Sequence, residues 1–575
     1  MRATTLLCGI ISCALTGPAA AGQETEATPK ASFARLVPKE TLVFASAADL
    51  ETLKNKLDAA GLKEIRENAE IKEFIKYLRT LAPSPQADED FLKGIPVEKI
   101  LETAQGEVAF ALEQLDVRAM AEESKLPEHM VVLIDAKSKA DALAEIVDAQ
   151  MDRAIEGGMR KEEESYQGIT ITSFKGDGPV GFSIARSGTI WAMAPTADVL
   201  RPLIQRLGEN DDDTLAQNER FKTVQREVGP NADAILFVNA KPLVEQITQA
   251  LKDLPEGGMQ ATGLVKAMLM SYGLQDMEAL GGGLTVQADR IDVTGYARVT
   301  ELKGMLKAMF PETGENPKMP DYVGDDAQMA SAAIFDFGAY WDSYTQMMAQ
   351  MFEQMGVPMT IEDVMDQMEA QLGFDIKADL IDQIGSPIIF SASIPQDGLR
   401  VLYAIPVKDA TRVGDAVQGV VDLASQSGSA PTQEEYLDAT VYTFSEIVSL
   451  AVKNDILLIG IGDAVKPALR RMGKSESRLT DSPAYQELAR HLPERYLSFG
   501  YVSADGLARA VESIKDGSLL SIIPNVPEDP FSGEFDPDKI PDPRIITRHI
   551  SGMITWNART QDGVKTVGRV ALKKP

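Results

Sequence analysis

Short segments in the middle of the chain alternate between apolar and polar residues with the period of a β-strand. In one of them Ile169 and Ile171 alternate with Thr170 and Thr172. This spacing places the two isoleucines on one face and the two threonines on the other. The segment 166–174 is therefore predicted to be a strand with one buried face and one solvated face.

Short polar links join pairs of apolar runs. Ser187-Gly188 separates the runs 181–185 and 190–194, and Asn454-Asp455 separates the runs 448–452 and 456–460. Links of this length and composition are typical of β-hairpins. Parallel pairing would require a long crossover between the strands, so these links predict a mainly antiparallel sheet.

Helical patterns follow several of the predicted strands. Asp49 and Asp336 each stand between an apolar run and an amphipathic run, which is the position of a helix N-cap. Gly106 and Gly385 each stand between a helical pattern and a strand. We expect both glycines to end a helix in a conformation with positive φ.

Two of these patterns occur twice in the same order. The segment 166–174 recurs at 436–444, and the segment 198–208 recurs at 463–473. Further elements match between the two halves, while most differences are insertions. The sequence therefore predicts that one module was duplicated in tandem.

The predicted fold class is α+β, with two homologous modules that each contain a mainly antiparallel β-sheet packed with helices. The first module is expected at 38–303 and the second at 321–575. A linker rich in Pro and Gly is expected at 304–320, since these residues interrupt regular elements. The remaining residues are predicted to be a signal peptide (1–21) and a flexible lead-in (22–37).

The first residues have the pattern of an export signal: Arg2, then a short apolar run, then small residues before Gly22. Both cysteines, Cys8 and Cys13, lie inside this segment, so cleavage after Ala21 would leave a chain without thiols. The alternative is a lipoprotein anchored through Cys13. No later stretch has the length of apolar sequence that a transmembrane helix needs. We expect a periplasmic or secreted protein.

The composition is acidic, with 86 Asp and Glu against 57 Lys and Arg. This excess of negative charge argues against nucleic acid as a partner, because nucleic-acid binding requires a basic surface.

No catalytic or cofactor pattern is present. The three histidines, His129, His491 and His549, are isolated from one another and from nucleophile motifs, which favours a non-enzymatic protein without a cofactor. Acidic segments at 211–213 and 529–543 are interpreted as solvated loops, with a structural calcium ion as the alternative.

One methionine-rich stretch is the candidate binding surface. Met347, Met351 and Met355 recur every four residues, which would align them on one helix face, and Met365 and Met368 follow closely. Three interpretations are open: packing against the rest of the protein, a groove for a partner or apolar ligand, and Cu(I) binding by thioethers.

The order of segments resembles a family of bacterial exported proteins known only as domain of unknown function 3352. The residues that carry the resemblance are 37–41, 49–50, 106–112 and 237–239. The second half departs from this pattern, since Gly324 stands in place of Pro38. The resemblance implies an exported α+β protein and no particular activity.

These observations favour a non-enzymatic protein that binds or scaffolds another component of the cell envelope. The first alternative is a periplasmic carrier of a lipid or another apolar ligand. The second is a hydrolase with an acidic site, because carboxylate pairs cannot be recognised from spacing alone.

Overall fold

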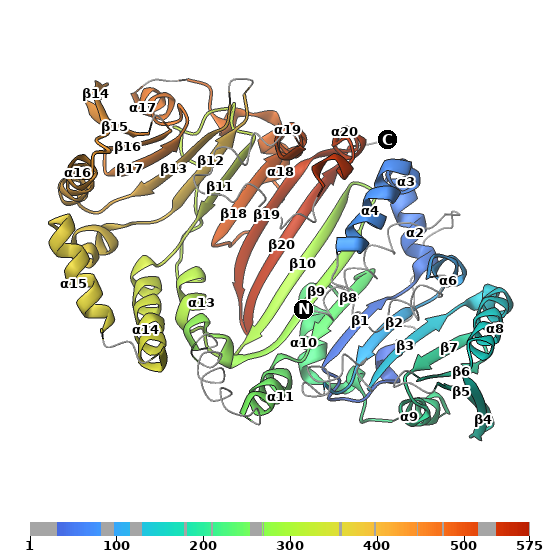
Figure 1. Cartoon of the computed structure of the whole chain (residues 1–575). Helices are drawn as coiled ribbons and strands as arrows, with labels where there is room; N and C mark the ends of the chain where they lie inside the picture. Colours follow the sequence, from blue (N-terminus) through green and yellow to red (C-terminus); the bar gives the residue numbers. More distant parts are fainter. Residues whose placement is uncertain are drawn as a thin grey trace. The chain divides into compact units, whose positions relative to one another are not determined.

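The computed structural model describes residues 32–573, except for 82–96, 116–128, 177–180, 209–210, 253–266, 268–269, 356–358, 396–397, 446, 474–475 and 516–535 (Figure 1). The predicted signal peptide, its two cysteines and most of the lead-in lie outside the described residues. The chain divides into two compact units. The first unit is Met1–Asp253 with Met277–Val299 and Lys574–Pro575, and the second is Leu254–Asp276 with Thr300–Lys573.

The strands of the first unit form an antiparallel sheet. Their order across the sheet is β4-β5-β6-β7-β3-β2-β1-β8-β9-β10. Their bounds are β1 Val43–Ala47, β2 Val108–Leu112, β3 Met130–Asp135, β4 Arg160–Tyr166, β5 Ile169–Lys175, β6 Gly181–Ser187, β7 Ile190–Ala194, β8 Ala234–Val238, β9 Met277–Val286 and β10 Arg290–Val299.

The strands of the second unit pair in the same way. Their order is β14-β15-β16-β17-β13-β12-β11-β18-β19-β20, and all these pairings are antiparallel. The predicted α+β class with antiparallel sheet is thus confirmed, while the duplication itself stays a prediction. The bounds are β11 Met329–Ala333, β12 Ile388–Ser393, β13 Arg400–Pro406, β14 Thr432–Tyr436, β15 Ala439–Phe444, β16 Val448–Lys453, β17 Ile456–Ile461, β18 Ser498–Ser503, β19 Ile550–Thr560 and β20 Gly563–Leu572.

Helices pack against both sheets. In the first unit they are α2 Leu50–Ala59, α3 Lys63–Glu67, α4 Ala69–Leu81, α6 Val97–Thr103, α8 Ala140–Glu156, α9 Ala197–Gly208, α10 Glu219–Val228 and α11 Ala240–Lys252. In the second unit they are α13 Gly304–Met309, α14 Phe337–Met355, α15 Ile361–Leu372, α16 Ala410–Gln426, α17 Val465–Gly473, α18 Pro483–Ala489, α19 Ala504–Lys515 and α20 Arg544–Thr547, with the short turns η5 Ile376–Leu380 and η6 Ile381–Gln383.

The predicted N-caps are confirmed at both aspartates. The Asp49 side chain accepts a hydrogen bond from the backbone N–H of Thr52 at the start of α2. The Asp336 side chain accepts one from the backbone N–H of Ala339 at the start of α14. Each carboxylate thereby satisfies an N–H that has no partner inside its own helix.

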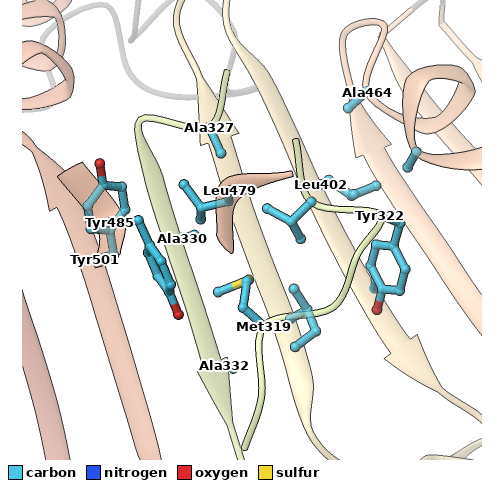
Figure 2. Packing of buried hydrophobic residues seen from close by; sticks show 14 of the residues in the cluster. Met319, Tyr322, Ala327, Ala330, Ala332, Leu402, Ala464, Leu479, Tyr485 and Tyr501 are labelled. Carbon is cyan, nitrogen blue, oxygen red and sulfur yellow. The ribbon is translucent and has the colours of Figure 1, made fainter. Parts of the chain in front are cut away.

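The largest core of each unit lies between one sheet face and the helices that cover it. In the first unit Leu200 and Leu203 of α9 lie fully buried with Ala109 and Ala111 of β2. In the second unit Leu469 of α17 lies in the corresponding core with Ile389 of β12, and Figure 2 shows part of this packing.

These cores correct the alignment of the two halves. Matching Gly106 to Gly385 makes Phe110 correspond to Ile389, yet Phe110 lies in a core cluster different from that of α9. Ala109 is the core-facing residue of β2 that corresponds to Ile389, so the alignment was wrong by one residue in this strand. A slip of one residue turns every side chain of a strand to the opposite face.

The expected positive φ at Gly106 and Gly385 is also wrong, because neither glycine is among those with positive φ. Close packing explains the two glycines instead. A Cβ at Gly106 would lie 2.3 Å from an Asp135 carboxylate oxygen, and one at Gly385 would lie 3.0 Å from the Pro406 carbonyl oxygen.

The hairpin predictions are confirmed at Gly188 and at Asn454-Asp455, all of which have positive φ in tight links. The strand expected over 166–174 is instead the end of one strand and the next strand after it. Tyr166 closes β4, and Gln167 turns the chain with positive φ before β5 begins. The sequence did not reveal β4 because its residues are mostly exposed and charged, as in a protected edge strand.

The segment 304–320, expected to be a linker, contains α13. Met305 and Ala308 of this helix are buried, and Met319 belongs to the core cluster of the second unit. The limits of the predicted modules stay a prediction. In the part of the chain that the structure describes, no helix is long and apolar enough to span a membrane.

Candidate functional site

Helix α14 carries the candidate site, and its sequence is unusually apolar for a helix at the surface. It has 19 residues, FGAYWDSYTQMMAQMFEQM, of which only Asp342 and Glu353 are charged. Surface helices normally place polar residues on the face turned toward solvent. No such polar face can be assigned to α14 from its sequence.

The burial of α14 agrees with its sequence. Its large apolar side chains are all half-buried, and none of those that the structure describes is fully buried. These side chains are Phe337, Tyr340, Trp341, Tyr344, Met347, Met348, Met351 and Phe352. The helix therefore leaves part of each apolar side chain exposed to solvent, while it packs against α13, α15 and η6.

An aromatic cluster forms the beginning of this surface. The ring of Phe335 lies 4.8 Å from that of Phe337 and 5.6 Å from that of Tyr340. Tyr344 extends the cluster, with ring centroids 6.4 Å from Tyr340 and 6.3 Å from Trp341. Aromatic pairs at such separations attract one another and keep the rings in fixed positions.

Helix α15 follows in the chain and contacts α14. Thr360 begins α15 with a capping box, in which its hydroxyl accepts from the backbone N–H of Asp363 and the Asp363 carboxylate accepts from the backbone N–H of Thr360. Met365 is half-buried, whereas Met368 is 45% exposed and Met359, just before the helix, is 42% exposed. The methionines of this surface thus remain accessible.

The predicted site residues fall on these two helices. Met347, Met351 and Met355 lie on α14 with helical spacing, and Met365 and Met368 lie on α15. The side chain of Met355 lies outside the described residues. Whether these methionines pack within the protein, bind a partner or an apolar ligand, or bind copper stays a prediction.

Sequence reasoning did not include the aromatic residues of α14 in the site. The signal was present, since four aromatic residues follow Phe335 within nine positions. It is the half-burial of these side chains that joins them to the methionines, and burial cannot be read from a helix without a polar face.

The charge of this surface has one sign. Between residues 337 and 372 the sequence contains six acidic residues and no lysine or arginine: Asp342, Glu353, Glu362, Asp363, Asp366 and Glu369. Lysine and arginine side chains are therefore the natural partners of this stretch.

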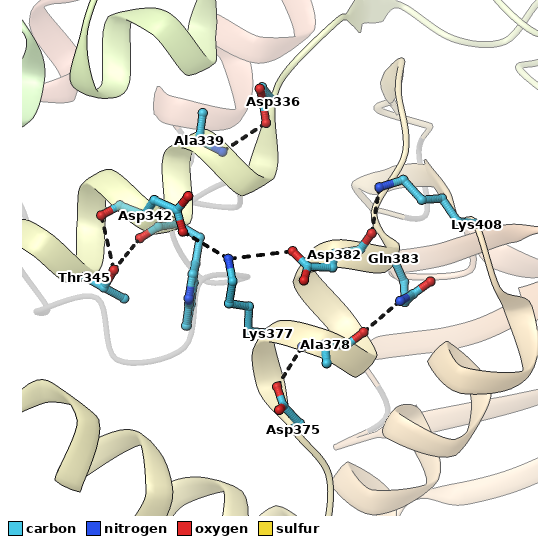
Figure 3. A network of polar contacts seen from close by, with 11 residues as sticks. Asp336, Ala339, Asp342, Thr345, Asp375, Lys377, Ala378, Asp382, Gln383 and Lys408 are labelled. Carbon is cyan, nitrogen blue, oxygen red and sulfur yellow. Dashed lines mark hydrogen bonds and ion pairs between the residues drawn. The ribbon is translucent and has the colours of Figure 1, made fainter.

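A lysine from the following segment makes one such contact. Lys377 of η5 donates to Asp342 of α14 at 3.0 Å and lies 3.7 Å from Asp382 of η6 (Figure 3). The hydrogen bond to Asp342 raises the pKa of Lys377. All three side chains are well exposed, so these ion pairs contribute little to the stability of the contact between α14 and η5.

Other polar candidates have structural contacts. Asp211 accepts from Arg206 and from the backbone N–H of Asp213. Within the described residues, no group of three or more His, Cys, Asp or Glu is arranged to hold a metal ion. The loop 529–543 is described only from residue 536 onward.

The fold and this surface define an α+β protein of two units with an apolar, acidic helical surface on the second. A protein family described as "Protein of unknown function (DUF3352)" matches residues 4–525 in one continuous stretch, and the chain belongs to this family. The resemblance drawn from the sequence is thereby confirmed.

Comparison with curated proteins finds no match. Among solved structures, crystal form III of TP0453 is 11% identical and aligns over 47% of this chain and 81% of that chain, with a TM-score of 0.24. Crystal form IV of TP0453 is 13% identical over 49% and 87%, also with a TM-score of 0.24. TM-scores this low carry no argument about fold or function.

Proposed function

We propose that this is an exported, non-enzymatic protein of the cell envelope that binds a partner protein through α14 and α15. The segment that it recognises is amphipathic and basic, with an apolar face bordered by lysine or arginine. The observation that carries the proposal is the half-burial of every described large apolar side chain of α14.

The apolar part of the surface supplies the affinity. Removing apolar surface from water is worth about 25 cal/mol per Å². Aromatic side chains such as Trp341 and Tyr344 frequently dominate binding energies, because they bury a large area with few rotatable bonds. Methionine side chains adapt to partners of different shape, since they are unbranched and polarisable.

The acidic residues determine the specificity for a basic partner. The run of six carboxylates without a basic residue attracts a positively charged segment and repels an acidic one. Most of these carboxylates are exposed, so their effect is screened by salt over about 10 Å at ordinary ionic strength. Binding should therefore weaken as salt increases.

The test uses a synthetic helical peptide with leucine on one face and lysine on the flanks, measured by calorimetry. A second peptide replaces each lysine by glutamate. The substitutions Met347→Gln and Met351→Gln together should weaken binding of the basic peptide about tenfold, because they keep helix propensity and remove apolar contact.

The matched control is Ile155→Gln on α8, which removes a 45% exposed apolar side chain from the first unit. It should leave binding unchanged. Equal binding of the two peptides, or an equal loss in both variants, would show that α14 is not the binding surface.

Export is tested separately by fractionation and by the mass of the mature chain. The expected N-terminus is Gly22, and a mass with lipid attached to Cys13 would support the lipoprotein alternative. The carrier and hydrolase hypotheses stay predictions.

A further inference from the structure

A small pocket in the second unit lies where β12, β13 and the start of α17 meet. Its volume is about 40 Å³, enough for a group of a few atoms. Two arginines and two serines, Arg400, Arg471, Ser391 and Ser393, contribute to its lining. The pocket is independent of α14 and of the function proposed above.

Arg471 is a largely buried charge of the pocket, with 16% of its side chain exposed. Its Nη2 donates to Asp326 at 2.8 Å. Its Nε is buried without a hydrogen bond, and a carboxylate oxygen of Glu476 lies 3.8 Å from it. Among the described residues, Asp326 is therefore the one hydrogen-bond acceptor of this guanidinium.

Because Gly324 has no side chain, it leaves room for the Arg471 guanidinium. A Cβ at residue 324 would lie 2.2 Å from Cζ of Arg471 and 2.3 Å from a carboxylate oxygen of Asp326. The replacement of Pro38 by Gly324, noticed in the sequence, thus has a physical reason in the second unit.

Arg206 occupies the corresponding position of α9 in the first unit, two residues before the final glycine of its helix, as Arg471 does in α17. Pro38 pairs with Thr214 near it, as Gly324 pairs with Arg478. Unlike Arg471, Arg206 has a hydrogen-bond acceptor at its Nε. Its Nε donates to Asp211 at 3.0 Å and its Nη1 to the Leu36 carbonyl at 3.4 Å.

The first unit also has a carboxyl group, that of Glu113, near Arg206. Glu113 follows β2 on the same face as Ala109 and Ala111, and its carboxyl interacts with the charge of Arg206. With Ala109 corresponding to Ile389, Glu113 corresponds to Ser393. The second unit therefore has a serine where the first unit has a carboxylate.

Two residues next to this position are also more polar or more basic in the second unit than in the first. The residue paired across from Glu113 is His129, whose carbonyl accepts from the Glu113 N–H, and the residue paired with Ser393 is Arg400. Ala111 of the first unit corresponds to Ser391, which also lines the pocket. Among the described residues neither serine hydroxyl has a hydrogen-bond partner, so both can donate to a bound group.

We infer that this pocket binds a carboxylate group of another molecule, in the place that Glu113 fills within the first unit. A planar carboxylate fits the guanidinium of Arg471, and the hydroxyls of Ser391 and Ser393 supply further donors. Two carboxylates also line the pocket, Asp326 and Asp463, but both are exposed, so water screens them more than it screens Arg471.

The test is a calorimetric titration of the full chain with acetate and with a neutral acetylated tripeptide that has a free C-terminus. The expected Kd is on the order of 1 mM for acetate. Amidation of the tripeptide should abolish its binding. Tighter binding of the tripeptide than of acetate identifies a peptide C-terminus as the source, and equal binding identifies small carboxylates.

Two variants report on the pocket. Ser393→Glu introduces the carboxylate of the first unit and should weaken acetate binding at least tenfold, while Ser393→Ala removes one donor and should weaken it about threefold. Ser187→Ala, in the hairpin of the first unit, is the control and should change nothing. Unchanged binding in both Ser393 variants, or binding of the amidated peptide, would overturn the inference.

Discussion

Arg206 and Arg471 stand at corresponding positions of α9 and α17, yet their surroundings differ in one respect. Arg206 donates hydrogen bonds to Asp211 and to a backbone carbonyl and lies near the carboxyl of Glu113. Arg471 donates to Asp326, lies 3.8 Å from Glu476 without a hydrogen bond to it, and lines a small pocket. The Arg206 guanidinium thus has hydrogen-bond acceptors at Nε and Nη1, whereas Nε of Arg471 has none among the described residues.

The helices that follow the strands β1 and β11, α2 and α14, also differ in how deeply they are buried. Leu50, Leu53 and Leu57 of α2 are at most 3% exposed, and polar residues occupy the rest of that helix. None of the described side chains of α14 reaches such burial. We therefore propose binding surfaces, one apolar and one charged, on the second unit.

The largest expected effect concerns these two helices. Leu53→Ala should lower the free energy of unfolding by about 3–4 kcal/mol, because it leaves a cavity in a closed core. Met351→Ala on α14 should cost about 1 kcal/mol or less, since its side chain is already partly in water. Denaturant unfolding measures both, and equal losses would erase the distinction between the helices.

The second effect concerns Glu113, whose burial raises its pKa to about 7, with the charge of Arg206 opposing the shift. The unfolded carboxyl has the ordinary value of 4.5. Between these values the folded protein keeps a proton that the unfolded chain has released, so stability falls as pH rises. The fall should be at most about 3 kcal/mol and should be complete above about pH 7.

Glu113→Gln is the matched variant for this prediction, because it has the same shape and does not titrate. The difference in unfolding free energy between Glu113→Gln and the unchanged chain should grow from about pH 5 to about pH 8 in favour of the variant. A difference that is independent of pH would contradict the burial of this carboxyl.

A smaller effect is expected at Gly324. Gly324→Ala would force the end of the Arg471 side chain and Asp326 to move, at a cost of about 1 kcal/mol, because both groups are flexible. Gly314→Ala meets open space and serves as the control. Thermal unfolding should separate the two variants, and equal melting temperatures would show that Gly324 does not determine the position of Arg471.

The smallest effect is expected at the Lys377 network in Figure 3. Lys377→Ala should change stability by about 0.5 kcal/mol or less, since all three charged groups are well exposed. A loss above about 1 kcal/mol in denaturant unfolding would show that α14 depends on this lysine more than its exposure indicates.

Local features of the fold could be predicted from the sequence. The caps at Asp49 and Asp336 and the turn at Asn454-Asp455 depend on neighbouring residues, which the sequence displays directly. Strand β4 could not be recognised, because its exposed, charged residues show no apolar alternation.

Features that depend on tertiary packing could not be predicted from the sequence. The alignment through Gly106 and Gly385 was wrong by one residue, since only the cores show which face of β2 and β12 meets the helices. That slip concealed the relation between Glu113 and Ser393. The methionines of α14 were visible as a pattern, but the half-burial that makes them a candidate surface was not.

Beside Arg471, according to our proposal, there is room for a carboxylate of another molecule, whereas beside Arg206 there is none. The most direct measurement is NMR of the arginine side-chain Nε–H signals during a titration with acetate, with Arg206→Lys and Arg471→Lys used to assign them. We expect the Arg471 signal to shift and saturate while the Arg206 signal stays in place. Shifts of equal size at both arginines, or no shift at either arginine, would contradict the proposed carboxylate site at Arg471.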